Sequence, residues 1–581
     1  LDKRRTMQTM RAPLVSRAAL VLAVAAALPL VLAHGGDEGH GMHGDGNITE
    51  ADLPKDESEY PPTYFAHPEH RGLIVGHIAL MTIGWVFILP VGVAVMFSLV
   101  SSRYTIYTQF VFLATNAVGV LLSTIYNAST PDLYPGNAHH SIGWIITWVV
   151  SAQVLIGLVG RIARVVRGSH HNGDSEAHKH TFLPVSEEDY REFRHSNDSG
   201  QGTEPGTESL RSNSVSTVHG DHDLDNPHKE YEEDADFEEM PLTSPAPKAT
   251  KFGKLAKLAA STRIWTYFEL VYKIIDRIIL PFGFIAFATG MIAYARFFEG
   301  HGVYSGLAHW IKGGIFFWLG LFTLGRWSGS FAEVGWAWNI RPKPQHQRWR
   351  PTAEFTESFL IFFYGSTNIF MEHLGGASRG WTAQDLEHLA ITVLFIGGGL
   401  CGMLIESAWI RNLLNTSVIE VEPMPLSDEE REQTFEPATY KFSLNPIPAL
   451  VIMLLGIMMS SHQQPSMLSS MVHKQWGDLL LGASLGRGLT YVLIYLRPPT
   501  SIYPSRPPTE LLAAFGLMAG GIIFMASSSD TVEGMIHYKM EEMFMYTVTM
   551  GLVGVLMAWE IFVLALKGWA QRKEQRRSTF H

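Results

Sequence analysis

The sequence predicts an all-α fold, a polytopic bundle of about eleven membrane-spanning helices that follows a cleaved signal peptide. Of its 581 residues, 46% are hydrophobic and only 17% are charged, whereas soluble proteins carry roughly 25% charged residues. The apolar residues gather in runs close to the roughly 20 residues that cross a bilayer as a helix. The chain also opens with a basic segment, an apolar run and a small-residue cleavage pattern, which together are typical of a secretory signal.

The signal peptide is predicted over residues 1–33, which include a short N-terminal extension. Two arginines supply the basic region of "MRAPLVSRAALVLAVAAALPLVLAHGG", and Val31 and Ala33 occupy the −3 and −1 positions of the cleavage site. Cleavage after Ala33 would leave residues 34–72 as a tail on the lumenal or extracellular side.

The predicted lumenal tail is rich in histidine. Its first part reads "HGGDEGHGMHGDGN", with His34, His40 and His43 as candidate metal ligands. Asn47 begins the sequon Asn-Ile-Thr, which is a glycosylation acceptor on that side of the membrane.

A long polar segment divides the predicted spans into two groups. Three spans precede it and form a three-helix domain over 73–167, and eight follow it in a C-terminal membrane domain over 251–581. Residues 168–250 are acidic and rich in Ser and Gly, so we expect a disordered cytosolic loop that offers sites to kinases or cytosolic partners. The eleven spans lie near 73–100, 106–126, 141–163, 276–296, 305–325, 355–372, 387–409, 443–461, 474–496, 509–528 and 543–566.

The distribution of basic residues predicts the orientation. Lys and Arg fall mainly in the loops that are cytosolic if the N-terminus is lumenal, in agreement with the positive-inside rule. This orientation places the C-terminus in the cytosol and makes Asn127 a second usable sequon. The expected location is a membrane of the secretory pathway: the endoplasmic reticulum, the plasma membrane or the vacuole.

Composition and motifs argue against several classes of protein. Cys401 is the single cysteine, so no intrachain disulfide or cysteine-ligated cluster can form. The chain has no Walker loop, no Rossmann glycine fingerprint and no H-E-x-x-H pair. A net charge of −11 without a basic domain gives no support for nucleic-acid binding.

Ten of the 25 histidines share a predicted position, at the lumenal ends of spans or in the turns between them. Ionisable groups at membrane depth are costly and often functional, although a single histidine there can also bond lipid headgroups or backbone. The ten are His77, His139, His140, His301, His309, His373, His388, His462, His473 and His537.

His77 and His140 form the best-placed pair within this set. They lie at the same predicted depth in the first and third spans. Two imidazoles on facing helices would bind one haem b edge-on, and Gly76 and Gly143 would leave room for its ring.

A second possibility is a transition-metal site built from the remaining ligands. Carboxylate with imidazole suits Zn²⁺ or Mn²⁺, and Met with His suits copper. Asp385 and His388 are three residues apart and share a helix face. The candidate ligands are His34, His40, His43, His373, Asp385, His388, His462 and His473.

One charge is predicted in the middle of a span. Arg487 lies in "GASLGRGLTYV", where an unpaired charge is costly. We expect a structural ion pair, with Glu560 of the last span as the partner.

The first three spans resemble the core of the transmembrane cytochrome b-561 family. The resemblance rests on His77, Met81, Pro90 and Gly92 in the first span, and on the third-span residues His140, Gly143, Gln153 and Gly157. It implies that His77 and His140 are the axial ligands of the non-cytosolic haem. The family's second haem uses a histidine where this chain reads "YTIYTQFVF", so only one site is expected here.

The whole chain resembles the fungal Ytp-type family, in which a b-561-like domain precedes a multi-span domain. The blocks "FFYGSTNIFMEHLGG", "DLEHLAITVLFIGGGLCGMLIE" and "HQQPSMLSSMVHKQWGDLLLG" carry this resemblance. Three functions stay open: a single-haem electron-transfer protein with a lumenal small-molecule or protein donor, a Cu or Zn binding or transport protein, and a non-catalytic membrane scaffold.

Overall fold

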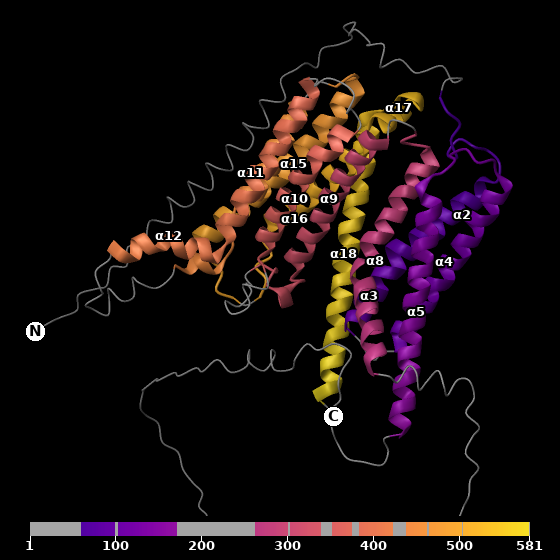
Figure 1. The fold of residues 1–581 in the computed structure, drawn as a ribbon, viewed down its shortest axis with the longest axis horizontal. Coiled ribbons are helices and arrows are strands. Elements are labelled where there is room, and N and C mark those ends of the chain that lie inside the picture. The colour runs from indigo at the N-terminus through magenta and orange to yellow at the C-terminus, as the bar shows by residue number, and fades with distance from the viewer. Residues whose placement is uncertain are drawn as a thin grey trace, which may run out of the picture. The chain divides into compact units, whose positions relative to one another are not determined.

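The computed structural model describes residues 60–98, 103–170, 262–299, 303–338, 351–374, 383–421, 437–461, 464–501 and 503–579. Over these residues the secondary structure consists of helices without strands, which confirms the all-α prediction. Figure 1 shows most of the described residues in long helices. The predicted signal peptide, His34, His40, His43, Asn47 and most of the acidic loop lie outside the described residues.

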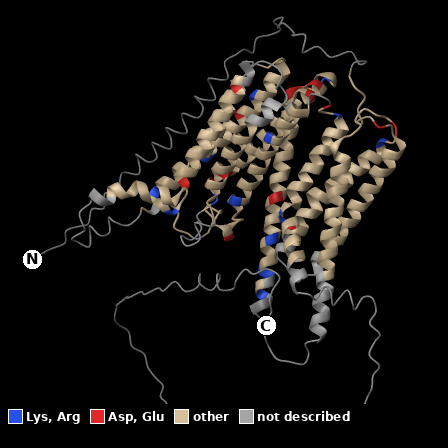
Figure 2. Ribbon diagram, viewed as in Figure 1, with Lys and Arg blue, Asp and Glu red and all other residues tan. Residues whose placement is uncertain are grey.

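Within the described residues, nine helices are long and apolar enough to cross a membrane. They match nine of the eleven predicted spans. The other two predicted spans also fall on helices, namely α10 (Ala353–Leu374) and the shorter α14 (Ile447–Ser461). Figure 2 shows that most of the helical surface carries neither acidic nor basic residues, as lipid-facing helices require.

The chain divides into two compact units. Of the described residues, those within 62–297 and 556–579 form the N-terminal unit, and those within 298–555 form the C-terminal unit together with residues 60 and 61. The division differs from the predicted one, because α8 (Thr262–Ala295) belongs with the first three spans.

The N-terminal unit is a bundle of long helices. Its first span is built from α2 (Arg71–Thr82), the π-helix η2 (Ile83–Ile88) and α3 (Leu89–Ser98). Next come α4 (Arg103–Ser129), α5 (Ala138–His170), α8 and the end of α18 (Glu542–Thr579). α2 packs against α4, and α5 packs along α8. The buried core contains Val93, Phe112, Ile146, Val150 and Ile279.

A specific contact holds η2 in place. A π-turn widens the helix and leaves carbonyl groups that the regular ladder does not use. The Val86 carbonyl accepts a hydrogen bond of 2.8 Å from the Trp559 indole, and Trp85 donates to Asn116 at 3.1 Å.

The C-terminal unit contains the remaining helices. They are α9 (Val303–Ser328), η5 (Ala332–Val334), α10, α11 (Ala383–Glu406), α12 (Ala408–Val421), η7 (Ala438–Lys441), α14, α15 (Met467–Leu496), α16 (Pro508–Ala526), α17 (Ser529–His537) and the first part of α18. α9 and α16 pack closely because Gly313 and Gly521 face each other's backbone.

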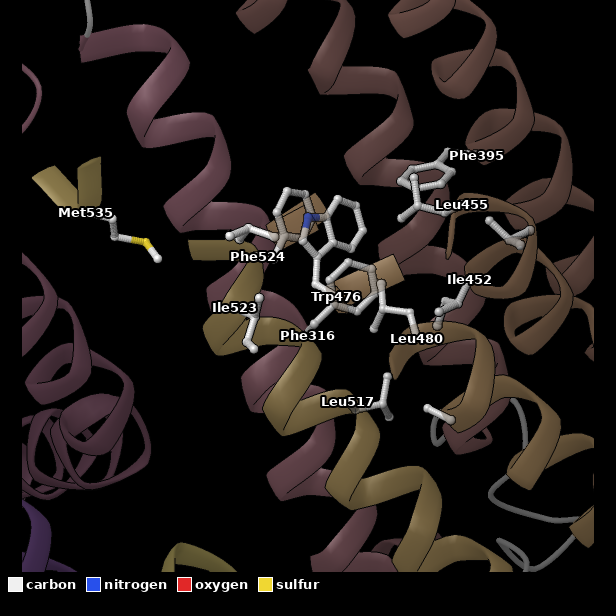
Figure 3. Close-up of a cluster of buried hydrophobic side chains, with 13 residues drawn as sticks. Phe316, Phe395, Ile452, Leu455, Trp476, Leu480, Leu517, Ile523, Phe524 and Met535 are labelled. Carbon is white, nitrogen blue, oxygen red and sulfur yellow. The ribbon is translucent and has the colours of Figure 1, made fainter. Parts of the chain in front are cut away.

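An aromatic core joins these helices. The Trp476 and Phe524 rings stack with centroids 4.0 Å apart and planes 5° from parallel. Figure 3 shows them surrounded by apolar side chains from several helices, including Phe316, Leu480 and Ile523.

Candidate functional site

An imidazole pair lies inside the N-terminal unit. His77 on α2 and His139 on α5 have ring centroids 6.2 Å apart, with their planes at 71°. His77 is buried, and His139 is partly buried. The two rings come from helices that belong to different packed pairs, α2 with α4 and α5 with α8.

Each imidazole is fixed by the helix packed against its own. His77 Nδ1 lies 2.8 Å from the Gly119 carbonyl of α4, and His139 Nδ1 lies 3.1 Å from the Ala286 carbonyl of α8. A carbonyl oxygen only accepts hydrogen bonds, so each Nδ1 is the donor. In a neutral ring the lone pair is then on Nε2, which is the arrangement that metal-ligating histidines adopt.

Glycines at these contacts let the rings approach the neighbouring helices. A Cβ added at Gly290 on α8 would lie 3.0 Å from His139 Cε1. A Cβ added at Gly119 on α4 would lie 2.9 Å from the Met81 methyl group, one turn beyond His77. Gly143, one turn beyond His139, has no heavy atom within 4 Å of the corresponding position.

His140 was the predicted partner of His77, and the structure places the imidazole of the neighbouring residue His139 beside His77 instead. His140 is exposed, and its backbone N–H donates to Asn137. Successive residues of an α-helix point about 100° apart. His139 shares its face with the buried residues Ile146 and Val150.

A second, outward-facing stripe of α5 contains His140. Trp144 and Trp148, four and eight residues after it, are 41% and 68% exposed. His140 therefore belongs to an outward-facing stripe of α5.

The donor set of His77 and His139 fits haem b or a single transition-metal ion. Metal–imidazole bonds of about 2.0 Å place the ring centres of two axial histidines roughly 6 Å apart. Both rings carry the carbonyl hydrogen bond that orients such ligands. A Cβ added at Gly143 would meet no heavy atom within 4 Å, whereas the space expected beside Gly76 is filled by Leu122, 3.0 Å from the added Cβ.

The other predicted metal ligands are not brought together among the described residues. No group of three or more His, Cys, Asp or Glu side chains there could hold a metal. His462 lies outside the described residues, as do the side chains of His373 and Asp385. His388 is half-buried on α11, and the sequon residue Asn127 is exposed in the last turn of α4.

His473 lies in a second imidazole pair that the sequence did not predict. Its ring is 6.0 Å from that of His309, at 85°. Its Nδ1 donates to the Ser469 carbonyl of its own helix at 2.8 Å. Trp476 and Phe524 also contact the two rings, so this pair is part of the aromatic core.

Arg487 has partners other than the predicted Glu560, and that prediction is wrong. Its Nε lies 2.8 Å from the Glu510 carboxylate, and its Nη1 lies 3.4 Å from Glu357. Both carboxylates lie within the C-terminal unit, whereas Glu560 falls in the N-terminal unit. Glu560 Oε2 is buried with no hydrogen-bond partner among the described residues.

Two family profiles match the chain. One, described as "Protein YTP1-like, C-terminal", covers residues 282–568. The other, described as a domain of unknown function, covers residues 58–163. No solved structure matches.

Curated fungal proteins match over long segments. An uncharacterized membrane protein of Schizosaccharomyces pombe is 32% identical over 512 residues, which cover 86% of this chain and 94% of that protein. An uncharacterized membrane protein of Saccharomyces cerevisiae is 40% identical over 52% of this chain and 47% of its own length. Protein YTP1 of Saccharomyces cerevisiae is 24% identical over 31% of each chain.

Fold and relatives together define an α-helical, polytopic membrane protein. The chain belongs to the fungal Ytp-type family, as its sequence blocks predicted.

Proposed function

We propose that the protein is a membrane-embedded electron-transfer protein that binds one haem b between His77 and His139. The observation that carries the proposal is the pair of imidazoles whose ring centroids lie 6.2 Å apart, each of which donates a hydrogen bond from Nδ1–H to a carbonyl of another helix. When bound, haem would supply a one-electron redox centre within the membrane. The resemblance to cytochrome b-561 supports the same reading, with His139 in place of His140.

The protein's own residues would position and insulate such a group. The Gly119 and Ala286 carbonyls set the tautomer of the two imidazoles. Apolar helices on both sides would exclude water and so tune the redox potential.

The test is a reduced-minus-oxidised optical spectrum of the full-length, detergent-solubilised protein. We expect a b-type α-band that is lost in His77→Ala and in His139→Ala. His140→Ala is the matched control: it removes the adjacent, outward-facing imidazole and should keep the band.

A flat spectrum from the wild-type protein would overturn the haem proposal. Elemental analysis then separates the remaining functions. About one Cu or Zn per chain, lost in the same two variants, would indicate a metal-binding protein. Neither haem nor metal would leave the pair as a packing feature and favour a scaffold.

We also propose the finer topology: a lumenal N-terminus, a cytosolic C-terminus and a place in the secretory pathway. The distribution of Lys and Arg supports it. Enzymatic removal of glycans should change the electrophoretic mobility of the protein. A mobility shift that is lost only in the double variant Asn47→Gln/Asn127→Gln would support this orientation. A shift that persists in that variant would count against these two sites.

A further inference from the structure

A network of five buried charged side chains lies within the C-terminal unit. Arg326 on α9 and Arg487 on α15 meet Glu354 and Glu357 of α10 and Glu510 of α16. All five are less than 10% exposed. No function considered above uses them.

The network contains two cations and three carboxyl groups. Two carboxylates are held closely: Glu354 lies 2.7 Å from Arg326, and Glu510 lies 2.8 Å from Arg487. These are the distances of charge-assisted hydrogen bonds. The two pairs are electrically neutral, so an ionised Glu357 would add an uncompensated negative charge.

Glu357 differs from the other two carboxyl groups in its geometry. Its two oxygens lie 3.4 Å from Arg326 and 3.4 Å from Arg487, beyond the length of a charge-assisted bond. Glu354 and Glu510 lie in the first turns of their helices, where the helix dipole stabilises a negative charge. Glu357 lies one turn further in and gains less from that dipole.

The surroundings of the network supply little compensation for an extra charge. The Trp338 ring covers both guanidinium groups, with centroids 4.7 and 5.8 Å from their central carbons. Thr323 accepts from Arg487 at 3.1 Å. Tyr491 is also buried, and its ring lies 6.2 Å from that of Trp338. Leaving a net charge in such a setting is strongly unfavourable.

We propose that Glu357 is a membrane-embedded proton-binding site. With the proton bound, the network is neutral and Glu357 bridges the two arginine–glutamate pairs. Loss of the proton adds one negative charge shared between Arg326 and Arg487. A metal cation is a poor occupant because both Glu357 oxygens face guanidinium groups.

The test is infrared spectroscopy of the full-length protein in detergent, which resolves the C=O stretch of a protonated carboxylic acid from that of a carboxylate. We expect such a band near neutral pH, with a downshift in D₂O. Glu357→Gln should remove the band of one carboxylic acid, seen when the spectrum of the variant is subtracted from that of the wild type. Exposed Glu387 gives the matched control, and Glu387→Gln should leave the band unchanged.

A second variant tests the proposal without changing Glu357 itself. Glu510→Gln removes one carboxylate, so Glu357 should ionise to balance Arg487, and the same band should disappear. An unchanged band in both Glu357→Gln and Glu510→Gln would overturn the proposal. So would a wild-type protein with no protonated carboxyl group near neutral pH.

Discussion

The two units each contain a histidine pair, and the pairs differ in how they are held. The ring centroids are 6.2 Å apart in one and 6.0 Å apart in the other. In the N-terminal unit both imidazoles donate Nδ1 to carbonyls of other helices. In the C-terminal unit His473 donates to its own helix and lies against Trp476. Ring separation alone therefore does not identify a ligand site, whereas orientation of both rings by neighbouring helices favours one.

The largest expected effect is on the aromatic core. Trp476→Ala removes a fully buried ring stacked on Phe524. We expect a loss of about 3–5 kcal/mol of stability, seen as a lower midpoint in thermal unfolding. Any haem or metal content per folded chain should be unchanged. A parallel loss of bound group would break the contrast between the two units.

Replacing one histidine from each pair sharpens the contrast. His473→Ala should cost about 1–3 kcal/mol, because a buried hydrogen-bonded ring is removed from the core, and should leave bound group unaffected. His77→Ala should instead remove the bound group. Thermal unfolding and absorbance of the two purified variants measure both effects, and the reverse pattern would assign the ligand role to the C-terminal pair.

A smaller effect is expected at the glycine beside His139. Gly290→Ala places a methyl group 3.0 Å from the ring, so His139 must shift at a cost of about 1 kcal/mol or more. We expect weaker retention of the bound group during purification. Gly554→Ala, where the added Cβ meets nothing within 4 Å, is the control and should retain it.

The smallest effect is expected at His140. His140→Ala changes an exposed side chain, so stability should stay within about 0.5 kcal/mol. Thermal unfolding measures this directly. A loss of the bound group comparable to that in His77→Ala would instead assign a ligand role to His140.

The sequence predicted the helices far better than the partners of individual side chains. Apolar runs of span length determine where helices occur, because backbone groups must pair internally in lipid. His139 and His140 are adjacent, and only the packing of α5 along α8 selects one of them. The exposed tryptophans four and eight residues after His140 were the available signal, but tryptophan is common both at lipid surfaces and in cores.

Arg487 illustrates the same limit in the C-terminal unit. Its partners lie 130 and 23 residues away in sequence, and nothing in local spacing favours them over other acidic residues. The excess of three carboxyl groups over two arginines in this network follows from the packing of α9, α10, α15 and α16, and not from the sequence. Buried charge in the sequence predicts that compensation exists, and the fold decides which residue provides it.

The π-helix in the first span has a consequence for the evolution of this family. A π-turn is the trace of one inserted residue in an α-helix. Deleting one residue between Ile83 and Ile88 would restore a regular helix and leave the two halves of the span facing nearly the same neighbours, because the wider turn absorbs the extra residue locally. A single-residue gap at this place in an alignment would therefore be compatible with a relative whose His77 equivalent faces the same helix. A gap in the regular parts of the span would instead rotate the two halves by about 100° relative to each other.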